Sequence, residues 1–281
     1  MTGDIRALLA RHLPGYRVET VTLSGEGLDN AAYEVNGDIM VRLRKAADPQ
    51  TVQRETALLA AVRELSTLPV PEVLFADAES GVLVYRKLPG VPLHGNPVPD
   101  PSRLAEPLGR FLSVLHAAPV DEMRELAPPD LYPSATLLRD AELDYRDVES
   151  YVPAAQRPLV ERFLAGSAPA DPPVLTFCHN DLGSEHLLVD PATGEITGVL
   201  DWSDAAVTDP AHDFARIYRD LGPDVFDLVL SHYDGPLGEE DRTRVAFHAR
   251  CALIEDLAYG LSTGPRQYAD AALAALPRTF A

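Results

Sequence analysis

The hydrophobic pattern of the N-terminal third of the chain changes period along its length. Short runs in which apolar and polar residues alternate, each bounded by a turn, predict strands at 18–24, 31–35, 39–45, 72–77 and 81–88. After the third of these runs, from Asp48 onward, the apolar positions recur with a period of about 3.6 and Pro49 stands near the start, which predicts a helix. The pattern therefore indicates a small sheet with one helix inserted after its third strand, preceded by an amphipathic N-terminal helix.

A different pattern follows residues 89–102, which are rich in proline and glycine and are predicted to form a hinge. Helices are predicted at 102–117, 136–166, 208–232 and 239–262, and strands flanking loops at 176–190 and 195–204. The fold class is therefore α+β with two lobes. A small, β-rich N-terminal lobe is expected over 1–88 and a larger, mainly helical C-terminal lobe over 89–281.

The composition is globular and acidic. The 281 residues include 24 Lys and Arg and 43 Asp and Glu, which gives a formal net charge of −19 at pH 7. This balance excludes nucleic acid as the expected partner, because binding a polyanion requires clustered basic side chains. No apolar run reaches the roughly 18 residues of a membrane span, and the N-terminus lacks a signal-peptide pattern. We therefore expect a cytoplasmic protein without a membrane partner, whose two cysteines, Cys178 and Cys251, are buried and reduced.

The negative charge lies mostly beyond the predicted hinge. Residues 1–88 hold 10 basic and 12 acidic side chains, a net charge of −2, whereas residues 89–281 hold 14 and 31, a net charge of −17. Such an excess can serve solubility alone, or it can attract a cationic ligand. Composition by itself does not choose between these two explanations.

Two carboxylates stand in loops beside short apolar strands. The sequence HNDLGSEH at 179–186 precedes the apolar residues LLV, and the apolar residues GVL lead to Asp201 and Trp202. Phosphoryl transfer requires one carboxylate that orients and deprotonates the accepting hydroxyl, and another that holds Mg²⁺ against the nucleotide phosphates. Asp181 and Asp201 suit these two roles, respectively.

At these residues the chain resembles the aminoglycoside phosphotransferase family, which shares the bilobal fold of protein kinases. The family's catalytic loop reads H-x-D-x-x-x-x-N and its metal loop reads apolar-Asp-Trp or apolar-Asp-Phe, which His179, Asp181, Asp201 and Trp202 match. The resemblance implies ATP or GTP as phosphate donor and Mg²⁺ as metal ion, held by Asp201 and His186. His186 stands where most members carry a metal-binding asparagine, and imidazole is a softer ligand than Mg²⁺ prefers, so an orienting or packing role stays open.

The resemblance extends over nearly the whole chain and implies a nucleotide site in the N-terminal lobe. The turn at 24–30 takes the place of the phosphate-covering loop, with Ser24, Gly25 and Gly27 as implied contacts. Arg42 stands at the position of the third-strand lysine that contacts phosphates, and Glu55 matches the acid that pairs with it. The segment 83–90 resembles the linker between lobes, in which the purine would be hydrogen-bonded by backbone groups of Val84, Tyr85 and Arg86.

Two further positions are expected to support these loops without touching a ligand. His116 ends a leucine-rich helix and is expected to be structural. Asp209 precedes Pro210 and is expected to cap the helix that follows and to brace the catalytic loop.

The acceptor is the least determined part of the prediction, because one fold serves many acceptors in this family. The acidic C-terminal lobe favours a polycationic molecule, with Asp204, Glu255 and Asp256 as candidate contacts; adjacent helical side chains project about 100° apart, so one of the last two is expected to enter the cleft. We predict a monomeric antibiotic O-phosphotransferase acting on an aminoglycoside or a tuberactinomycin-type cyclic peptide. A metabolic kinase for choline, homoserine or a sugar, and a catalytically silent nucleotide-binding module, remain as alternatives.

Overall fold

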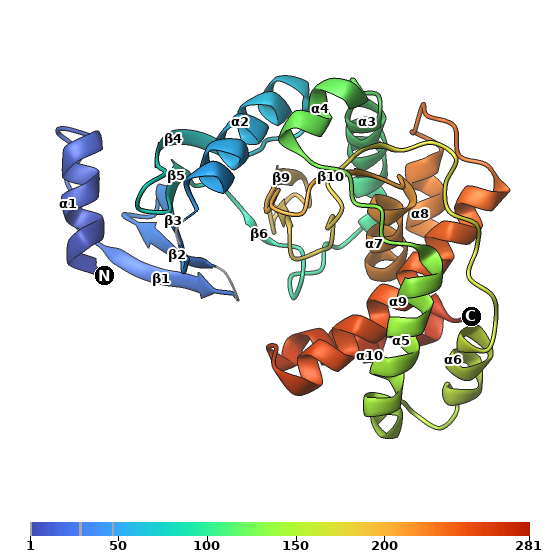
Figure 1. Ribbon diagram of the computed structural model, residues 1–281. Helices are drawn as coiled ribbons and strands as arrows, with labels where there is room; N and C mark the ends of the chain where they lie inside the picture. Colours follow the sequence, from blue (N-terminus) through green and yellow to red (C-terminus); the bar gives the residue numbers. More distant parts are fainter. Residues whose placement is uncertain (1, 28–29, 47) are drawn as a thin grey trace.

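The computed structural model describes residues 2–27, 30–46 and 48–281; Leu28 and Asp29, in the turn expected to cover phosphate, lie outside them. The N-terminal part contains an antiparallel five-stranded sheet with the order β1-β2-β3-β5-β4 (Figure 1). Its strands are β1 (Val21–Glu26), β2 (Asn30–Val35), β3 (Ile39–Arg44), β4 (Glu72–Asp77) and β5 (Val82–Arg86). All five predicted strands are confirmed, although β1 continues through the expected glycine turn by way of a bulge between Leu23 and Gly25.

Two helices cover opposite faces of this sheet (Figure 1). Side chains alternate between faces along a strand, so Val84 joins the core beneath α1 (Thr2–His12), while Leu83 joins the core beneath α2 (Pro49–Leu65). The predicted start of α2 is confirmed, because the Asp48 carboxylate accepts hydrogen bonds from the first free backbone N–H groups of the helix. The α2 face is the one that meets the rest of the molecule.

The C-terminal part is mainly helical. Its helices are α3 (Ala105–His116), α4 (Val120–Leu126), α5 (Ser134–Val148), α6 (Arg157–Leu164), α7 (Ala211–Leu221), α8 (Pro223–Leu230), α9 (Glu239–Ser262) and α10 (Arg266–Thr279), with 3-10 turns η1 (Pro101–Leu104) and η2 (Glu149–Tyr151). A second core joins α5, α6, α9 and α10 into one arm of the molecule (Figure 1). Both cysteines are buried and free of disulfides, as predicted, and none of the described helices combines the length and apolarity that a bilayer crossing demands.

Short strands hold the loops at the centre of the molecule. They are β6 (Val91–Pro92), β7 (Thr176–Cys178), β8 (Leu187–Val189), β9 (Ile196–Val199) and β10 (Ala206–Thr208). β6, β8 and β9 form one antiparallel sheet, and β7 pairs with β10 in another. The two conserved-looking carboxylate loops of the sequence therefore start and end on paired, buried strands, which fixes their positions.

Three sequence expectations are wrong in detail. The helix predicted over 136–166 is interrupted between Val148 and Arg157, where Pro153 prevents its continuation. The helix predicted over 208–232 breaks at Gly222, whose φ of 88° leaves the helical region. The proline-rich segment 89–102 is anchored to the C-terminal part, because β6 pairs with β8 and Leu93 N donates to Leu187 O at 2.8 Å. It is therefore not a free hinge.

Candidate active site

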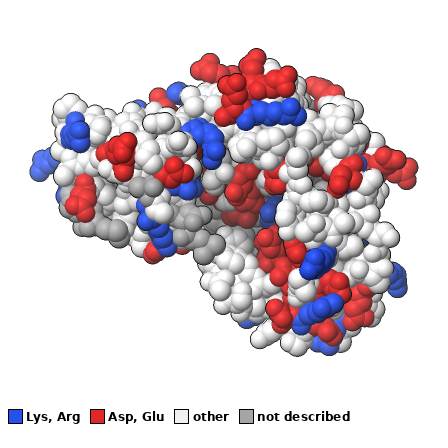
Figure 2. Space-filling model, in the orientation of Figure 1, with Lys and Arg blue, Asp and Glu red and all other residues white. Residues whose placement is uncertain are grey.

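A large cavity of about 1410 Å³ lies between the sheet and the helical part. Strands β1 to β3 and helix α2 form one wall, while the loop at 179–186, the Asp201 loop and helices α5, α7 and α9 form the other. Figure 2 shows acidic side chains gathered in this hollow. Drug-sized ligands occupy pockets of about 300–1,000 Å³, so this cavity has room for a nucleotide and a second molecule together.

The catalytic loop at 179–186 is held from below by a buried carboxylate on α7. Asp213 is fully buried and accepts hydrogen bonds from His179 N at 3.1 Å, Asn180 N at 2.7 Å and His116 Nε2 at 3.0 Å. Burial alone would raise the pKa of Asp213, but these donors and the His116 ring hold it below its usual range, so it is a carboxylate. The structural role expected of His116 is thereby confirmed.

The bracing role expected of Asp209 is wrong. Asp209 does cap α7, by accepting from Ala211 N at 2.9 Å, but its other oxygen pairs with Arg244 Nε at 2.7 Å, away from the loop. Asp213 and Asp220 brace the loop instead, since Asp220 accepts from Ser184 N at 2.7 Å. A sequence pattern places all three on the same helix but does not show which of them points back at the loop.

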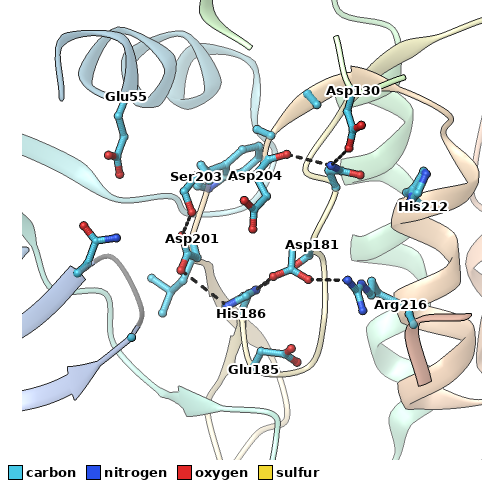
Figure 3. Close-up of a pocket in the computed structure, with 18 of the residues that line it drawn as sticks. Glu55, Asp130, Asp181, Glu185, His186, Asp201, Ser203, Asp204, His212 and Arg216 are labelled. Carbon is cyan, nitrogen blue, oxygen red and sulfur yellow. Dashed lines mark hydrogen bonds and ion pairs between the residues drawn. The ribbon is translucent and has the colours of Figure 1, made fainter. Parts of the chain in front are cut away.

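Asp181 points into the cavity with a cationic or proton-donating group at each oxygen (Figure 3). Arg216 Nη2 lies 3.2 Å from its Oδ1, and His186 Nδ1 lies 3.4 Å from its Oδ2. His186 Nδ1 also donates to the Asp181 carbonyl at 2.8 Å. The preceding Asn180 has a φ of 68°, a left-handed conformation that turns the loop sharply and is held by its amide donating to Asp204 O at 3.1 Å.

Asp201 follows β9 on the neighbouring loop and also has a left-handed backbone, with a φ of 53°. Trp202 is buried beneath it, and Ser203 Oγ donates to Asp201 Oδ1 at 2.6 Å. Burial alone would raise the pKa of Asp201, but Arg42, His186 and the Ser203 hydroxyl hold it below its usual range. This carboxylate is therefore ionised and aimed at the junction between the two walls.

The residues here suit a hard divalent cation. Ligand atoms of Asp181, Glu185 and His186 lie within 4.8 Å of one another, and Asp201 Oδ2 lies 3.9 Å from His186 Nε2. Burial would lower the pKa of His186, but Asp181, Asp201 and Glu185 outweigh it and raise that pKa. The carboxylate oxygens of Asp201 and Glu185 are the donors that Mg²⁺ prefers, whereas the ligating role predicted for His186 stays a prediction.

The N-terminal wall carries arginines around one buried acid. Arg42 Nη1 lies 2.5 Å from Glu55 Oε1, as the sequence predicts for this pair, and Arg42 Nη2 lies 3.7 Å from Asp201 Oδ1. Arg44, which sequence reasoning missed, lies on the same face of β3 with Nη1 3.9 Å from Glu55 Oε2. Arg54 also lines this part of the cavity. The alternation of β3 puts residues two apart on one face, which was the available signal for Arg44.

The predicted nucleotide contacts are placed unequally. Gly25 and Gly27 line the cavity, whereas Ser24 lies outside its lining. Val84, Tyr85 and Arg86 belong to β5, which pairs with β3 on one side and β4 on the other. The expectation that the linker starts at 83 is therefore wrong; it starts after Arg86, and a purine contact by these three backbones remains a prediction.

The three predicted acceptor contacts all line the cavity. The expectation that only one of Glu255 and Asp256 would enter it is wrong, because α9 presents both to the same broad opening. Asp256 is not free, however, since Arg219 Nη1 lies 2.5 Å from its Oδ2. Burial raises the pKa of Asp204, and the nearby charges of Asp181 and Asp201 raise it further.

Three further acids on this wall were missed from the sequence. Asp130 precedes α5, and Asp140 and Asp144 stand one turn apart on it, facing the cavity. The four-residue spacing of the last two is a signal for a shared helix face. Which face meets the cavity depends on how α5 packs against α9, and sequence reasoning does not reach that.

Charge divides the cavity into two ends. The N-terminal wall presents Arg42, Arg44 and Arg54 against Glu26 and Glu55. The C-terminal wall presents one cation, Arg216, against nine acids, namely Asp130, Asp140, Asp144, Asp181, Glu185, Asp201, Asp204, Glu255 and Asp256. An anionic ligand therefore suits one end and a cationic ligand the other, with Asp181 and Asp201 where the two ends meet.

A β-rich lobe over a helical lobe, with two carboxylate loops between them, defines a phosphotransferase of the protein-kinase-like class. Comparison with known proteins agrees, because a profile described as "Phosphotransferase enzyme family" matches residues 20–248. The chain belongs to this family, which confirms the resemblance stated from the sequence.

Individual relatives and solved structures are similar over most of the chain. Viomycin phosphotransferase of Streptomyces vinaceus is 26% identical over 237 residues, covering 80% of this chain and 82% of that protein. Hygromycin-B 4-O-kinase of Escherichia coli is 27% identical over 167 residues, and the match spans only 48% of its length. The solved complex of the phosphotransferase APH(2″)-IIIa with GDP and kanamycin has a TM-score of 0.72 at 20% identity and covers 98% of each chain, which confirms the predicted bilobal fold.

Proposed function

We propose that this protein transfers the γ-phosphoryl group of ATP or GTP to a hydroxyl group of a polycationic antibiotic. The observation that carries the proposal is the charge division of one cavity: three arginines against two acids on the N-terminal wall, and nine acids against one arginine on the C-terminal wall. A triphosphate suits the first and a polycation the second. The reacting groups would meet at Asp181 and Asp201, where the walls join.

The chemistry follows from the residues at that junction. The Asp181 carboxylate accepts the proton of the acceptor hydroxyl, whose oxygen forms a bond to the γ-phosphorus as the bond from that phosphorus to the bridging oxygen breaks. The nucleoside diphosphate leaves. Arg42, positioned by Glu55 at 2.5 Å, stabilises the phosphate charge from the N-terminal wall. His186 and Arg216 fix the plane of the Asp181 carboxylate, so that the base needs no reorientation.

Asp201 and Glu185 would hold Mg²⁺, which supplies charge neutralisation to the nucleotide phosphates when it is bound. Their carboxylates face the same space as Asp181, and Asp201 is also 3.7 Å from Arg42 Nη2. The ligand-free contact between Asp201 and Arg42 thus joins the two walls where the phosphates are proposed to lie.

The class of acceptor is supported by this wall and by the relatives. Similarity to viomycin phosphotransferase over 82% of its length favours a cyclic peptide of the tuberactinomycin type. The kanamycin complex of a neighbour with the same fold favours an aminoglycoside. Both molecules are polycations that carry hydroxyl groups. The reaction takes place, in this proposal, in the cytoplasm, where ATP and GTP are available, and in a monomer, since the walls described above come from one chain.

Mass spectrometry of a substrate panel tests the proposal. The panel contains viomycin, kanamycin, hygromycin B, a macrolide, choline, homoserine and a hexose, each incubated with the protein, Mg²⁺ and either ATP or GTP. We expect one phosphoryl group to be added to at least one polycation, and to none of the metabolites at comparable rate. Transfer confined to choline, homoserine or the sugar, or nucleotide binding without any transfer, would contradict it.

A pair of variants on α5 tests the acidic wall itself. Asp144 lines the cavity, whereas Asp147 on the same helix is exposed and does not. We expect Asp144→Asn to raise the KM of the polycation several-fold, by roughly the effect of one partly screened charge, and to leave the nucleotide KM unchanged. Asp147→Asn serves as the matched control and should change neither. Equal effects of the two variants would show that the charge acts without contact.

A further inference from the structure

Arg216 is an exception in the acidic wall. It is the one Lys or Arg among the described cavity-lining residues of the C-terminal part, and it reaches from α7 to lie 3.2 Å from Asp181 (Figure 3). Its side chain is only 19% exposed, and no other ion pair of Arg216 lies within 4.0 Å in the described structure. A positive charge therefore stands beside the proposed base, in the part of the molecule that otherwise collects negative charge.

The acids closest to Arg216 along α7 are already neutralised by a second arginine. Arg219 Nη1 lies 2.5 Å from Asp256 Oδ2, and its Nη2 lies 3.9 Å from Glu185 Oε2. Asp181 is paired with Arg216 in the same way. The surroundings of the base are thus balanced in charge, and they do not offer a free site for an ammonium or guanidinium group of the acceptor.

The free negative charge lies elsewhere in the cavity. Five lining carboxylates have no ion pair to a lysine or arginine in the described ranges: Asp130, Asp140, Asp144, Asp204 and Glu255. Burial raises the pKa of Asp144, and its neighbours Asp140 and Asp147 raise it further. Burial likewise raises the pKa of Glu255, with Asp256 and Asp144 adding to the effect and Arg216 opposing it. These acids repel one another until a cation binds among them.

We infer that Arg216 determines acceptor specificity by repelling cationic groups from the neighbourhood of Asp181. The inference rests on the proposed function and narrows its substrate class. The acceptor is a polycation whose reacting hydroxyl has no ammonium or guanidinium group on the adjacent carbon. Its cationic groups lie farther from that hydroxyl and bind the five unpaired carboxylates. Arg216 thereby selects which of several hydroxyl groups on one antibiotic is presented to the base.

The size of the effect follows from Coulomb repulsion between two unit charges about 4 Å apart near a protein surface. Allowing for partial exposure of the guanidinium, we expect an adjacent cation to lower kcat/KM roughly 10- to 100-fold in the unmodified protein. Replacing Arg216 by methionine removes the charge at similar length. The repulsion should then disappear, whatever happens to the absolute rate.

The test compares two derivatives of the acceptor that is turned over, one carrying and one lacking an amine on the carbon next to the phosphorylated hydroxyl. In the unmodified protein the amine-bearing derivative should have a 10- to 100-fold lower kcat/KM, and in Arg216→Met the two derivatives should react within about threefold of each other. The ratio cancels any loss of rate that comes from leaving Asp181 without its partner. Arg216→Lys, which keeps the charge, should restore most of the discrimination.

Arg242→Met is the matched control, because Arg242 pairs with Asp227 on the surface, away from the cavity lining. It should keep the discrimination of the unmodified protein. Discrimination that persists in Arg216→Met, or that is absent from the unmodified protein, would overturn the inference. If Arg216→Met does not fold, Arg216→Gln replaces it in the same comparison.

The two proposals fail separately. If no acceptor is phosphorylated at all, the proposed function fails, and calorimetric binding of kanamycin to the unmodified protein and to Arg216→Met still decides the role of Arg216. Loss of the guanidinium should then tighten kanamycin binding by about 10-fold, since it removes a like charge from the cavity. Unchanged or weaker binding would overturn the inference.

Discussion

Asp213→Asn is the substitution for which the structure makes its most definite prediction. The carboxylate is fully buried on α7 and is the common acceptor for His179 N at 3.1 Å, Asn180 N at 2.7 Å and His116 Nε2 at 3.0 Å. An amide of the same shape keeps one oxygen and presents an NH₂ group to at least one of these donors. One buried donor is thus left without an acceptor, in either orientation of the amide.

The expected loss combines two contributions. An orphaned buried donor costs about 1–3 kcal/mol, and hydrogen bonds to a charged group are worth roughly 1.5–3 kcal/mol each against about 1 for neutral ones. We therefore expect Asp213→Asn to lower the free energy of unfolding by about 2–4 kcal/mol in urea titrations at pH 7. Because the folded-state pKa of Asp213 lies below its usual value, its stabilisation is complete above the usual pKa of 3.8 and is lost only as pH falls below it.

The same substitution should slow catalysis, since the left-handed Asn180 precedes Asp181 and depends on this brace. A shift of about 1 Å at the base can cost 10²-fold, and we expect kcat to fall by about that factor with little change in either KM. Asp227→Asn removes a carboxylate from an exposed pair and should cost less than about 0.5 kcal/mol with full activity. A variant at Asp213 with unchanged stability and kcat would refute the bracing role.

Three further outcomes are expected. Glu55→Gln should raise the nucleotide KM roughly tenfold in steady-state assays while leaving the acceptor KM unchanged, because it weakens the hold on Arg42; a larger effect on the acceptor would contradict the assignment of the two walls. Glu255 has a pKa raised by burial and by neighbouring acids, so the acceptor KM should rise as pH falls through the window just above 4.5, whereas Glu255→Gln should have a higher KM at pH 7, a flatter pH profile and, since a raised carboxylate pKa lowers stability as pH rises, a higher unfolding free energy. Gly90→Ala should destabilise the protein by roughly 1–3 kcal/mol in thermal unfolding, because Gly90 has a φ of 98° and a Cβ there would lie 2.7 Å from Val189 O; a neutral result would mean that this connection yields easily.

The parts of the site that the sequence predicts are those set by local pattern. Asp181 and Asp201 each follow a short apolar strand, and the period of two and the turn residues that define such strands are local signals. Arg42 and Glu55 were paired only through the family resemblance, and the 2.5 Å contact confirms that pairing. Order along the chain thus carried the reacting groups.

What was missed depends on tertiary packing. Asp130 and Asp144 approach the base only because α5 packs beside α9, and Arg216 does so because α7 passes under the catalytic loop. Neither packing leaves a local signal. By contrast, the breaks near Pro153 and at Gly222 did have signals in the sequence, since proline ends a helix and glycine takes the left-handed conformation.

The central claim is that Asp181 acts as the base for phosphoryl transfer to a polycation held in the same cavity. The most direct measurement follows formation of phosphorylated acceptor by the unmodified protein and by Asp181→Asn, with nucleotide and acceptor binding measured calorimetrically for both. We predict that the variant binds both ligands within about threefold of the unmodified protein and transfers phosphate about 10²–10⁴-fold more slowly. Undiminished transfer by Asp181→Asn, or no transfer to any polycation by the unmodified protein, would contradict the claim.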